Sequence, residues 1–196
     1  MGLLDGAPYL IPSDGTDPLT SLAEFDSIVL DIGFGMGDTV EPFALADPAT
    51  GILAVDVHTP GIGDLLHRCA HTPLPNVRVI EGDALEVLAR MAPGSLTGVR
   101  SFFPDPWPKA RHHKRRLIQP PVLDLVAARV QPGGWWHLAT DWLEYSEAML
   151  ETFDAHPLWA GGVVDRPPWR PETRFERTGL REGRVVLDLW FTRNAT

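Results

Sequence analysis

The 196-residue sequence has little cysteine, little lysine and no long apolar segment. Its single cysteine, Cys69, excludes an intrachain disulfide. No run approaches the ~18 consecutive apolar residues of a membrane-spanning helix, and the first residues lack the basic-then-apolar layout of a signal peptide. These shortages lead us to expect a cytoplasmic protein with no membrane partner.

Basic residues are missing from the first third of the chain. Residues 1–67 contain eleven acidic residues and no Lys or Arg, whereas residues 68–196 hold all seventeen basic residues against fifteen acidic ones. The overall charge of −9 argues against a nucleic-acid partner at first sight. Contact with phosphate depends on the local face rather than on net charge. A basic face formed by the later residues therefore remains possible on this acidic protein.

The composition fits one globular domain. The sequence is 44% hydrophobic and 22% charged, which suits a chain of this length with a full-sized core. Residues 1–26 are rich in Gly, Pro and Asp and lack basic residues, so we expect an acidic, loosely ordered N-terminal arm there. Residues 27–196 are expected to form the domain.

Short apolar runs alternate with helical patterns along this domain. Runs typical of strands occupy residues 27–32, 52–57, 77–80, 98–103, 135–139 and 185–192. Helical patterns occupy residues 39–46, 62–70, 84–91, 121–130 and 142–155, and Asp38 is the expected N-cap of the first. This alternation predicts an α/β fold, with a parallel sheet covered by helices on both faces.

An acidic residue stands at or just after each of the first five predicted strands. In a parallel sheet the ligand lies beyond the carboxyl ends of the strands, where the strand order reverses. A helix cap or a turn would explain any one of these acids equally well, but five in succession favour a ligand site. They are Asp31, Asp56, Asp83, Asp105 and Asp141.

A glycine-rich turn follows the first predicted strand. Gly33, Gly35 and Gly37 would let the backbone turn tightly and approach a ligand closely. Their spacing differs from the G-x-G-x-x-G turn that holds a dinucleotide pyrophosphate. With Asp56 placed to accept from ribose hydroxyls and Asp83 to meet an adenine amino group, the pattern predicts an adenosine site. Since no Walker lysine is present, S-adenosyl-L-methionine fits this site, with S-adenosyl-L-homocysteine as product.

The segment FFPDPWPKARHHKRRLIQP, residues 102–120, combines a stiff loop with a cationic strip. Its prolines exclude a helix in the first half, so Asp105 is expected on an extended loop. A rigid carboxylate beside a cationic strip suits the binding of one base of a polyanion. The alternative is a surface turn followed by a solvated helix start. His112 and His113 are adjacent and point different ways, so we expect no metal site.

Several motifs together carry a resemblance to a known family. They are LDIGFGMG (30–37), VDVHTPGIG (55–63), EGDALEVL (81–88), the segment 102–120, ATDW (139–142) and RPETRFERTGLREGRVVLDLWF (170–191). The sequence resembles the bacterial tRNA (guanine-N7-)-methyltransferase family of class I, S-adenosylmethionine-dependent methyltransferases. FPDPWPK followed by RHHKRRL and a later RPETRFE is specific to that family.

The resemblance implies a fold and a reaction. The fold would be a Rossmann-like, mostly parallel seven-stranded sheet with an antiparallel last strand and helices on both faces. The reaction would transfer a methyl group from S-adenosyl-L-methionine to N7 of the variable-loop guanine of tRNA. The enzyme would act as a monomer or homodimer. Two alternatives stay open, a dinucleotide-dependent dehydrogenase and a non-catalytic tRNA-binding relative of the same fold.

The resemblance also implies roles for particular residues. The cofactor would be bound by Asp31, Gly33, Gly35, Gly37, Asp56, Asp83 and Asp105. Asp105 would be the catalytic residue, in contact with either guanine or cofactor. The substrate contacts would be Lys109, Asp141, Thr173, Arg174, Phe175 and Glu176. RNA would be bound by Arg111, His112, His113, Lys114, Arg115 and Arg116.

The sequence departs from the family pattern at a few positions. Asp31 and Asp56 stand where glutamate is usual, and Arg184 stands where histidine is usual. A second cationic group lies near the C-terminal end of the chain, and it forms either a solvated face or a second phosphate-facing edge. Its members are Arg166, Arg170, Arg174, Arg177, Arg181 and Arg184.

Overall fold

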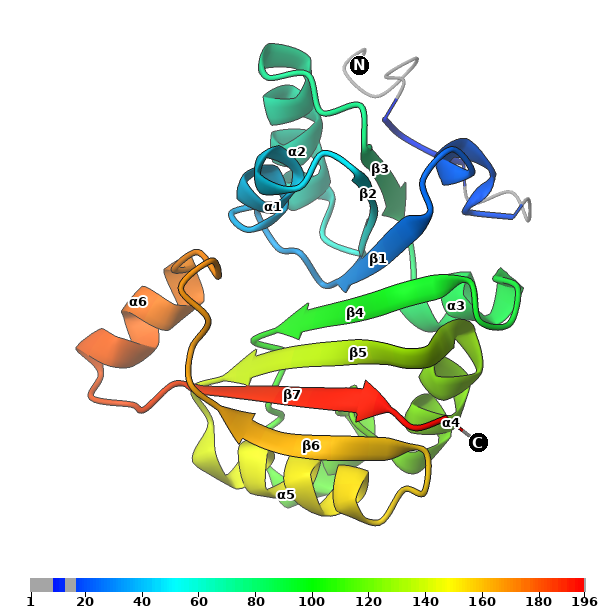
Figure 1. Cartoon of the computed structure of the whole chain (residues 1–196). Coiled ribbons are helices and arrows are strands. Elements are labelled where there is room, and N and C mark those ends of the chain that lie inside the picture. The colour runs from blue at the N-terminus through cyan, green and yellow to red at the C-terminus, as the bar shows by residue number, and fades with distance from the viewer. Residues whose placement is uncertain (1–8, 13–16, 196) are drawn as a thin grey trace.

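In the computed structural model of this protein, residues 9–12 and 17–195 are described. Seven strands form one sheet in the order β3-β2-β1-β4-β5-β7-β6 (Figure 1). The strands are β1 (Ser27–Ile32), β2 (Thr50–Asp56), β3 (Val77–Glu81), β4 (Leu96–Phe102), β5 (Val130–Thr140), β6 (Trp159–Val164) and β7 (Leu187–Arg193).

The sheet is parallel except for its last strand. β1 pairs in parallel with β2 and β4, and β3 and β5 extend the parallel set on either side. β7 runs antiparallel to both of its neighbours, β5 and β6. The predicted fold, a mostly parallel seven-stranded sheet with an antiparallel last strand, is confirmed. The strand order reverses between β1 and β4, which makes that gap the switch point of the sheet.

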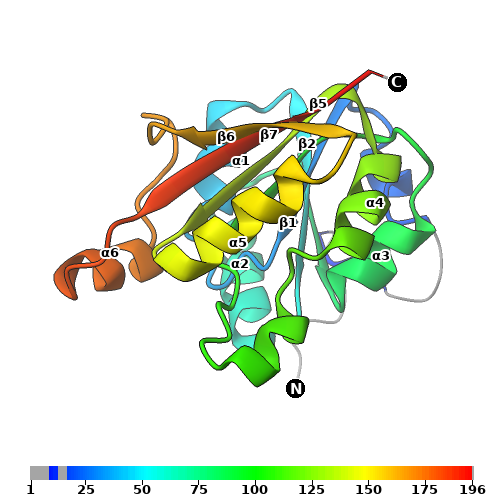
Figure 2. The same cartoon turned by 90° about the horizontal axis from the view of Figure 1, so that it is seen from below.

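Helices cover both faces of the sheet (Figures 1 and 2). The α-helices are α1 (Val40–Ala46), α2 (Thr59–His71), α3 (Ala84–Arg90), α4 (Pro120–Arg129), α5 (Leu143–Asp154) and α6 (Arg174–Arg181). Two short 3₁₀ helices are η1 (Thr20–Leu22) and η2 (Ala110–Arg115). Within the described ranges, no helix is long and apolar enough to cross a membrane.

Alternation of side chains along the strands produces two hydrophobic cores. On β2, Leu53 and Val55 point into the core beneath α3, α4 and α5, whereas Ile52 and Ala54 point into the core beneath α1 and α2. Because both faces are buried, the parallel strands read as continuous apolar runs in the sequence. That is why their positions could be predicted.

Two elements lie where the sequence predicted none. β6 has the sequence WAGGVV, and its two glycines weaken the strand signal. α6 has the sequence RFERTGLR, which is too polar to show an apolar stripe. The predicted N-cap Asp38 is also wrong, since α1 begins after Thr39. The Asp38 carboxylate instead accepts a hydrogen bond from Arg68 at 3.3 Å.

The described part of the expected N-terminal arm is packed onto the domain. The N–H of Ile11 donates to the carbonyl of Val79 at 2.9 Å, which adds a short bridge beside β3. Leu19 and Leu22 are buried in the core beneath α3. These residues therefore contact the sheet and its core. Residues 1–8 and 13–16 lie outside the described residues, and the expectation of a loosely ordered arm stays a prediction.

Candidate active site

A groove opens at the switch point, where the carboxyl ends of β1 and β4 diverge. Its volume is about 400 Å³ when the space open to solvent is included. Residues from β1 and its following turn, from the end of β4 and from the segment before α6 line it. These are Asp31, Gly33, Phe34, Met36, Asp38, Thr39, Phe102, Phe103, Thr173, Arg174 and Phe175. The groove thus brings together several predicted site residues that are far apart in the sequence.

The glycine turn adopts a backbone that other residues rarely adopt. Gly33, Gly35 and Gly37 have φ angles of 71°, 60° and 74°, in the left-handed region that glycine enters without a Cβ clash. No heavy atom lies within 4 Å of a Cβ built at Gly33. The turn therefore leaves open space at Gly33.

Gly61, in the first turns of α2, supports this glycine turn and was not among the predicted site residues. A Cβ at Gly61 would lie only 1.8 Å from the carbonyl oxygen of Gly35. Only glycine allows α2 to approach the turn this closely. The available signal was a glycine inside a helical pattern, which often marks a close backbone contact.

Asp31 places a buried carboxylate at the floor of the groove. The residue is 1% exposed, and its Oδ2 atom has no hydrogen-bond partner among the described residues. Burial raises its pKa to about 6, although the positive charge of Arg100, its register partner on β4, acts in the opposite direction. A buried carboxylate with a free oxygen is suited to a cationic or hydrogen-bond-donating ligand.

Asp56 holds the glycine turn from the end of β2. Its Oδ2 accepts from the N–H of Gly35 at 2.7 Å, and its Oδ1 accepts from the N–H of His58 at 2.9 Å. Each carboxylate oxygen can accept more than one hydrogen bond. Asp56 can therefore fix the turn and still accept from a ligand hydroxyl.

Asp83 acts as a helix cap. Its side chain accepts from the N–H of Leu85 at 2.8 Å, in the first turn of α3. This is the alternative role that the sequence pattern allowed for any one of the five acids. A contact between Asp83 and adenine stays a prediction.

The proline-rich loop after β4 is strained at two aromatic residues. Phe103 and Trp107 have positive φ angles of 54° and 44°, which are costly for residues other than glycine. The Phe103 ring lines the groove and stacks against Phe175 with 6.3 Å between ring centroids. Asp105 is exposed and does not line the groove, so its predicted contact with the cofactor or with guanine is untested.

The cationic strip forms η2, a 3₁₀ turn that follows Lys109. The side chains of Lys109, Arg111, Lys114 and Arg115 are exposed, and His112 and His113 are half-buried. The Arg115 guanidinium lies 4.9 Å from the centre of the Trp107 ring, which ties the strip to the loop before it. Within the described ranges, no three His, Cys, Asp or Glu side chains are grouped as a metal site would need.

Arg116 does not belong with the exposed strip, contrary to its predicted role in RNA binding. Its side chain is 3% exposed and forms an ion pair with Glu144 of α5. It also donates to the carbonyl of Pro106 at 2.8 Å and lies over the Tyr145 ring. Arg116 therefore anchors the proline-rich loop to α5 and is not available to phosphate.

Asp141, directly after β5, is held by residues of the C-terminal region. Its Oδ2 accepts from Nε of Arg184 at 2.8 Å, and a Cβ at Gly179 of α6 would lie 2.5 Å from the same oxygen. Arg184 is one of the positions that depart from the family pattern. The ion pair and the close helix together fix the direction of the Asp141 carboxylate.

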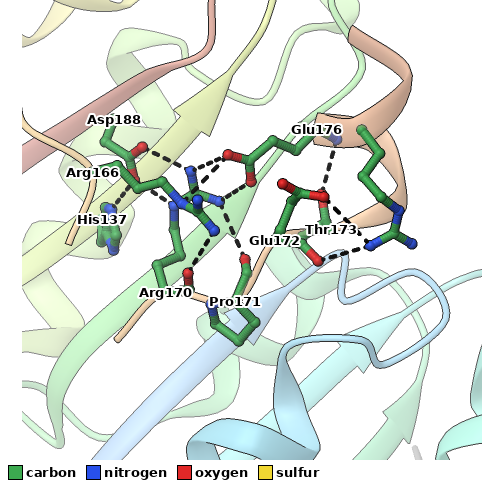
Figure 3. A network of polar contacts seen from close by, with 9 residues as sticks. His137, Arg166, Arg170, Pro171, Glu172, Thr173, Glu176 and Asp188 are labelled. Atoms are coloured by element: carbon green, nitrogen blue, oxygen red, sulfur yellow. Dashed lines mark hydrogen bonds and ion pairs between the residues drawn. The ribbon is translucent and has the colours of Figure 1, made fainter. Parts of the chain in front are cut away.

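The predicted substrate residues before and within α6 divide into two groups. Thr173, Arg174 and Phe175 line the groove, and the Phe175 ring would lie 3.6 Å from a Cβ at Gly35. Glu176 is instead 3% exposed and takes part in the polar network of Figure 3. Its carboxylate accepts from Nη1 of Arg170 at 2.7 Å, and a contact between Glu176 and substrate stays a prediction.

The sequence is similar to known methyltransferases over most of its length. A family model described as "Putative methyltransferase" matches residues 26–189. The chain is 56% identical over 172 residues to a tRNA (guanine-N(7)-)-methyltransferase of Streptomyces coelicolor, a match that covers 85% of this chain and 64% of the relative. A protein of the same name from Acidovorax sp. is 47% identical over 195 residues, covering 97% of this chain and 76% of the relative.

The chain spans about two thirds of the length of several of these relatives. It is 52% identical to the Bordetella pertussis protein of the same name, and this match covers 84% of this chain and 66% of the relative. Among solved structures, a variant of the 16S rRNA (adenine(1408)-N(1))-methyltransferase from Catenulisporales acidiphilia, described with the cosubstrate SAM, matches with a TM-score of 0.65. That match covers 94% of this chain and 93% of the other at 20% identity. The structural likeness shows a shared fold.

The contact between Gly61 and the glycine turn predicts a large effect of one methyl group. Gly61→Ala should lower the free energy of unfolding by roughly 1–3 kcal/mol, since the Cβ cannot fit against the carbonyl of Gly35. Gly63→Ala is the matched control on the same helix, where a Cβ meets no atom within 4 Å. Urea unfolding of both variants tests this, and equal stabilities would contradict it.

The buried carboxylate of Asp31 predicts a pH-dependent gain in stability on its removal. The pKa of Asp31 is about 6 in the folded protein against the ordinary value of 3.8. The unfolded chain therefore loses this proton at lower pH than the folded protein, and stability falls as pH rises through this interval and levels off above about pH 6. We therefore compare the free energy of unfolding of Asp31→Asn with that of the unmodified protein. The difference in favour of the variant should be about 1–2 kcal/mol larger at pH 8 than at pH 5. Urea titrations at both values measure this, and a pH-independent difference would refute it.

Proposed function

This chain belongs to the tRNA (guanine-N(7)-)-methyltransferase family, and we propose that it transfers the methyl group of S-adenosyl-L-methionine to N7 of a tRNA guanine. The guanine would be the one in the variable loop, at tRNA position 46. The observation that carries the proposal is the groove at the switch point, where the open glycine turn faces a buried carboxylate with a free oxygen. A tRNA substrate would place the enzyme in the cytoplasm.

Asp31 of the groove and the acidic residues that follow β2 and β3 would together hold S-adenosyl-L-methionine. Asp31 would take the cationic amino group of its methionine portion, beside the backbone of the glycine turn. Asp56 would accept from the ribose hydroxyls, and Asp83 would meet the adenine amino group at the neighbouring strand end. The bound cofactor supplies an electrophilic methyl group on a positively charged sulfonium.

The chain would contribute alignment and charge rather than a base. Guanine N7 already carries a lone pair, so no proton has to be removed before transfer. Asp105 and Asp141 would stabilise the positive charge that develops on guanine. The rings of Phe103 and Phe175 form an apolar wall of the groove. A single guanine must leave its stack to reach this wall, and holding it there supplies the alignment.

The tRNA backbone would lie along the exposed cationic strip. Lys109, Arg111, Lys114 and Arg115 present their charges beside the loop that carries Asp105. Arg174 and Arg181 extend the basic surface onto the exposed side of α6. This arrangement would bring phosphate contacts to both sides of the groove, on a protein whose overall charge is negative.

The decisive experiment combines the protein with methyl-labelled cofactor and an unmodified tRNA transcript. We expect one methyl group per tRNA, mapped as N7-methylguanine in the variable loop. A transcript with adenine at that position is the control and should accept none. Lack of transfer, or transfer to another base, would refute the proposal.

The exposure of Arg115 and the burial of Arg116 predict opposite effects of neutralising them. Arg115→Gln should reduce the slope of tRNA affinity against salt by roughly one unit, since one phosphate contact is lost. Arg116→Gln should leave that slope unchanged and lower stability, because it leaves the loop unanchored. Binding titrations at several salt concentrations test both variants. Equal changes in slope would mean that Arg116 also reaches phosphate.

The position of Asp105 on a strained loop predicts a loss of rate without loss of binding. Asp105→Asn keeps the shape, removes the charge and turns one acceptor into a donor. We expect methyl transfer to fall at least about tenfold, since removing preorganised charge typically costs a few kcal/mol. Single-turnover assays at saturating cofactor and tRNA measure this. A near-normal rate would show that the loop serves only as a scaffold.

A further inference from the structure

A buried guanidinium lies beside the carboxylate of Asp31, at the floor of the groove. Arg100 of β4 is 9% exposed and is the register partner of Asp31 on β1. Paired residues of neighbouring parallel strands project their side chains to the same face of the sheet, here the face that α1 covers. The carboxylate at the floor of the groove therefore has a positive charge next to it inside the protein.

Two aromatic residues hold the Arg100 side chain. Its guanidinium carbon lies 3.7 Å from the centre of the Phe43 ring of α1 and 5.8 Å from the centre of a Trp135 ring of β5. Its Nε and Nη1 atoms are buried and have no hydrogen-bond partner among the described residues. Aromatic faces stabilise a guanidinium as a cation. The site therefore holds Arg100 as a charge without using these two donors.

Asp31 and Arg100 each favour the charged form of the other. Burial raises the pKa of Asp31 to about 6, and Arg100 acts in the opposite direction. Burial lowers the pKa of Arg100 to about 10, and Asp31 opposes that effect in turn. Charges interact more strongly in the protein interior than they do in water. The pair therefore influences the protonation of Asp31 even though its Oδ2 atom has no hydrogen-bond partner among the described residues.

The other charged groups of the sheet near this pair do not replace Arg100. After burial and Arg100, the next influence on the pKa of Asp31 is Asp56 of β2, which raises it. Asp47, which follows α1, is negative and acts on Arg100. His137 of β5 is kept neutral by its burial, which lowers its pKa. These three groups therefore add no positive charge beside Asp31.

Two further charged residues line the same groove as Asp31. Asp38, which follows the glycine turn, is negative and contacts Arg68 at 3.3 Å. Arg174 of α6 is positive, but it is exposed, so water and salt screen its charge. Arg100 is therefore the buried cation that favours the ionised form of Asp31.

Packing alone does not explain a guanidinium at this position. β4 is buried on both faces, and apolar side chains are typical of such a strand. A buried cation with unsatisfied donors costs more stability than an apolar side chain of similar volume. This cost is explained if the ionised form of Asp31 is needed for binding.

On the basis of the proposed function, we propose that Arg100 is a positioning residue that keeps the Asp31 carboxylate ionised at neutral pH for the cationic amino group of the cofactor. Among the described residues, those that line the groove do not include Arg100, so it acts through Asp31 without touching the cofactor. Without its charge, Asp31 stays protonated to higher pH. Cofactor binding then requires the loss of a proton from Asp31.

The first test measures the protonation of Asp31 without any ligand. The difference in free energy of unfolding between Asp31→Asn and the unmodified protein levels off above about pH 6. In an Arg100→Met background the same difference should level off at a pH at least about one unit higher, because a neighbouring cation lowers the pKa of a carboxyl group by about 1 to 3. Urea titrations between pH 5 and 8.5 measure both.

Two features of this design protect it against misfolding of a variant. At pH 5 most Asp31 is protonated in both backgrounds, so Arg100→Met leaves little unpaired buried charge there. Arg100→Lys keeps the cation and should keep the levelling point of the unmodified protein.

The second test measures the binding of S-adenosyl-L-homocysteine by calorimetry between pH 6 and 8.5. The dissociation constant of Arg100→Met is divided by that of the unmodified protein at the same pH, which cancels the titration of the ligand. This ratio should fall at least about fivefold across the range, as Asp31 of the variant loses its proton. Arg129→Met, which removes a half-buried guanidinium beside α3 on the other face of the sheet, is the control and should give a constant ratio.

An unchanged levelling point in Arg100→Met would overturn the proposal, as would a ratio of dissociation constants that does not vary with pH. Neither test uses tRNA, and the first uses no ligand. A protein that binds S-adenosyl-L-homocysteine but methylates no tRNA would therefore refute the proposed reaction, while both tests would still decide the role of Arg100.

Discussion

The reversal of strand order between β1 and β4 is the constraint on which the site depends. The connection that follows β1 crosses one face of the sheet, and the connection that follows β4 crosses the other face. A crevice therefore stays open between the carboxyl ends of these two strands. The glycine turn, Asp31 and the loop with Phe103 all follow from that gap, since each lies in β1 or at the carboxyl end of one of the two strands.

The sequence predicted those features that depend on local pattern. β1 and β2 appear in the sequence as apolar runs because both faces of each strand are buried. The spacing of Gly33, Gly35 and Gly37 predicted the glycine turn. β6 and α6 were missed because glycines and charges hide their periodicity. The structure assigns Asp83 a local role as helix cap, which the sequence had allowed but could not select.

Buried ion pairs are a feature of the structure that the sequence did not predict. The resemblance assigned Arg116 to RNA binding and Glu176 to substrate binding, and it predicted no ion pair for either residue. Each is buried against a partner of opposite charge, Arg116 with Glu144 and Glu176 with Arg170. The Arg116 pair spans 28 positions in the sequence. The position of such a partner is set by the fold as a whole, so the pairing cannot be read from either residue alone.

The place of β7 between β5 and β6 also determines when the site can form during synthesis. Among the described residues, β6 pairs only with β7, so the nascent β6 lacks this partner until residues 187–193 leave the ribosome. Asp188, which holds Arg170, arrives with the same strand. The wall of the groove would therefore assemble last, after the parallel part of the sheet has had time to fold. A chain arrested before β7 would present an unpaired strand and an incomplete groove, which would make it a substrate for chaperones or proteases.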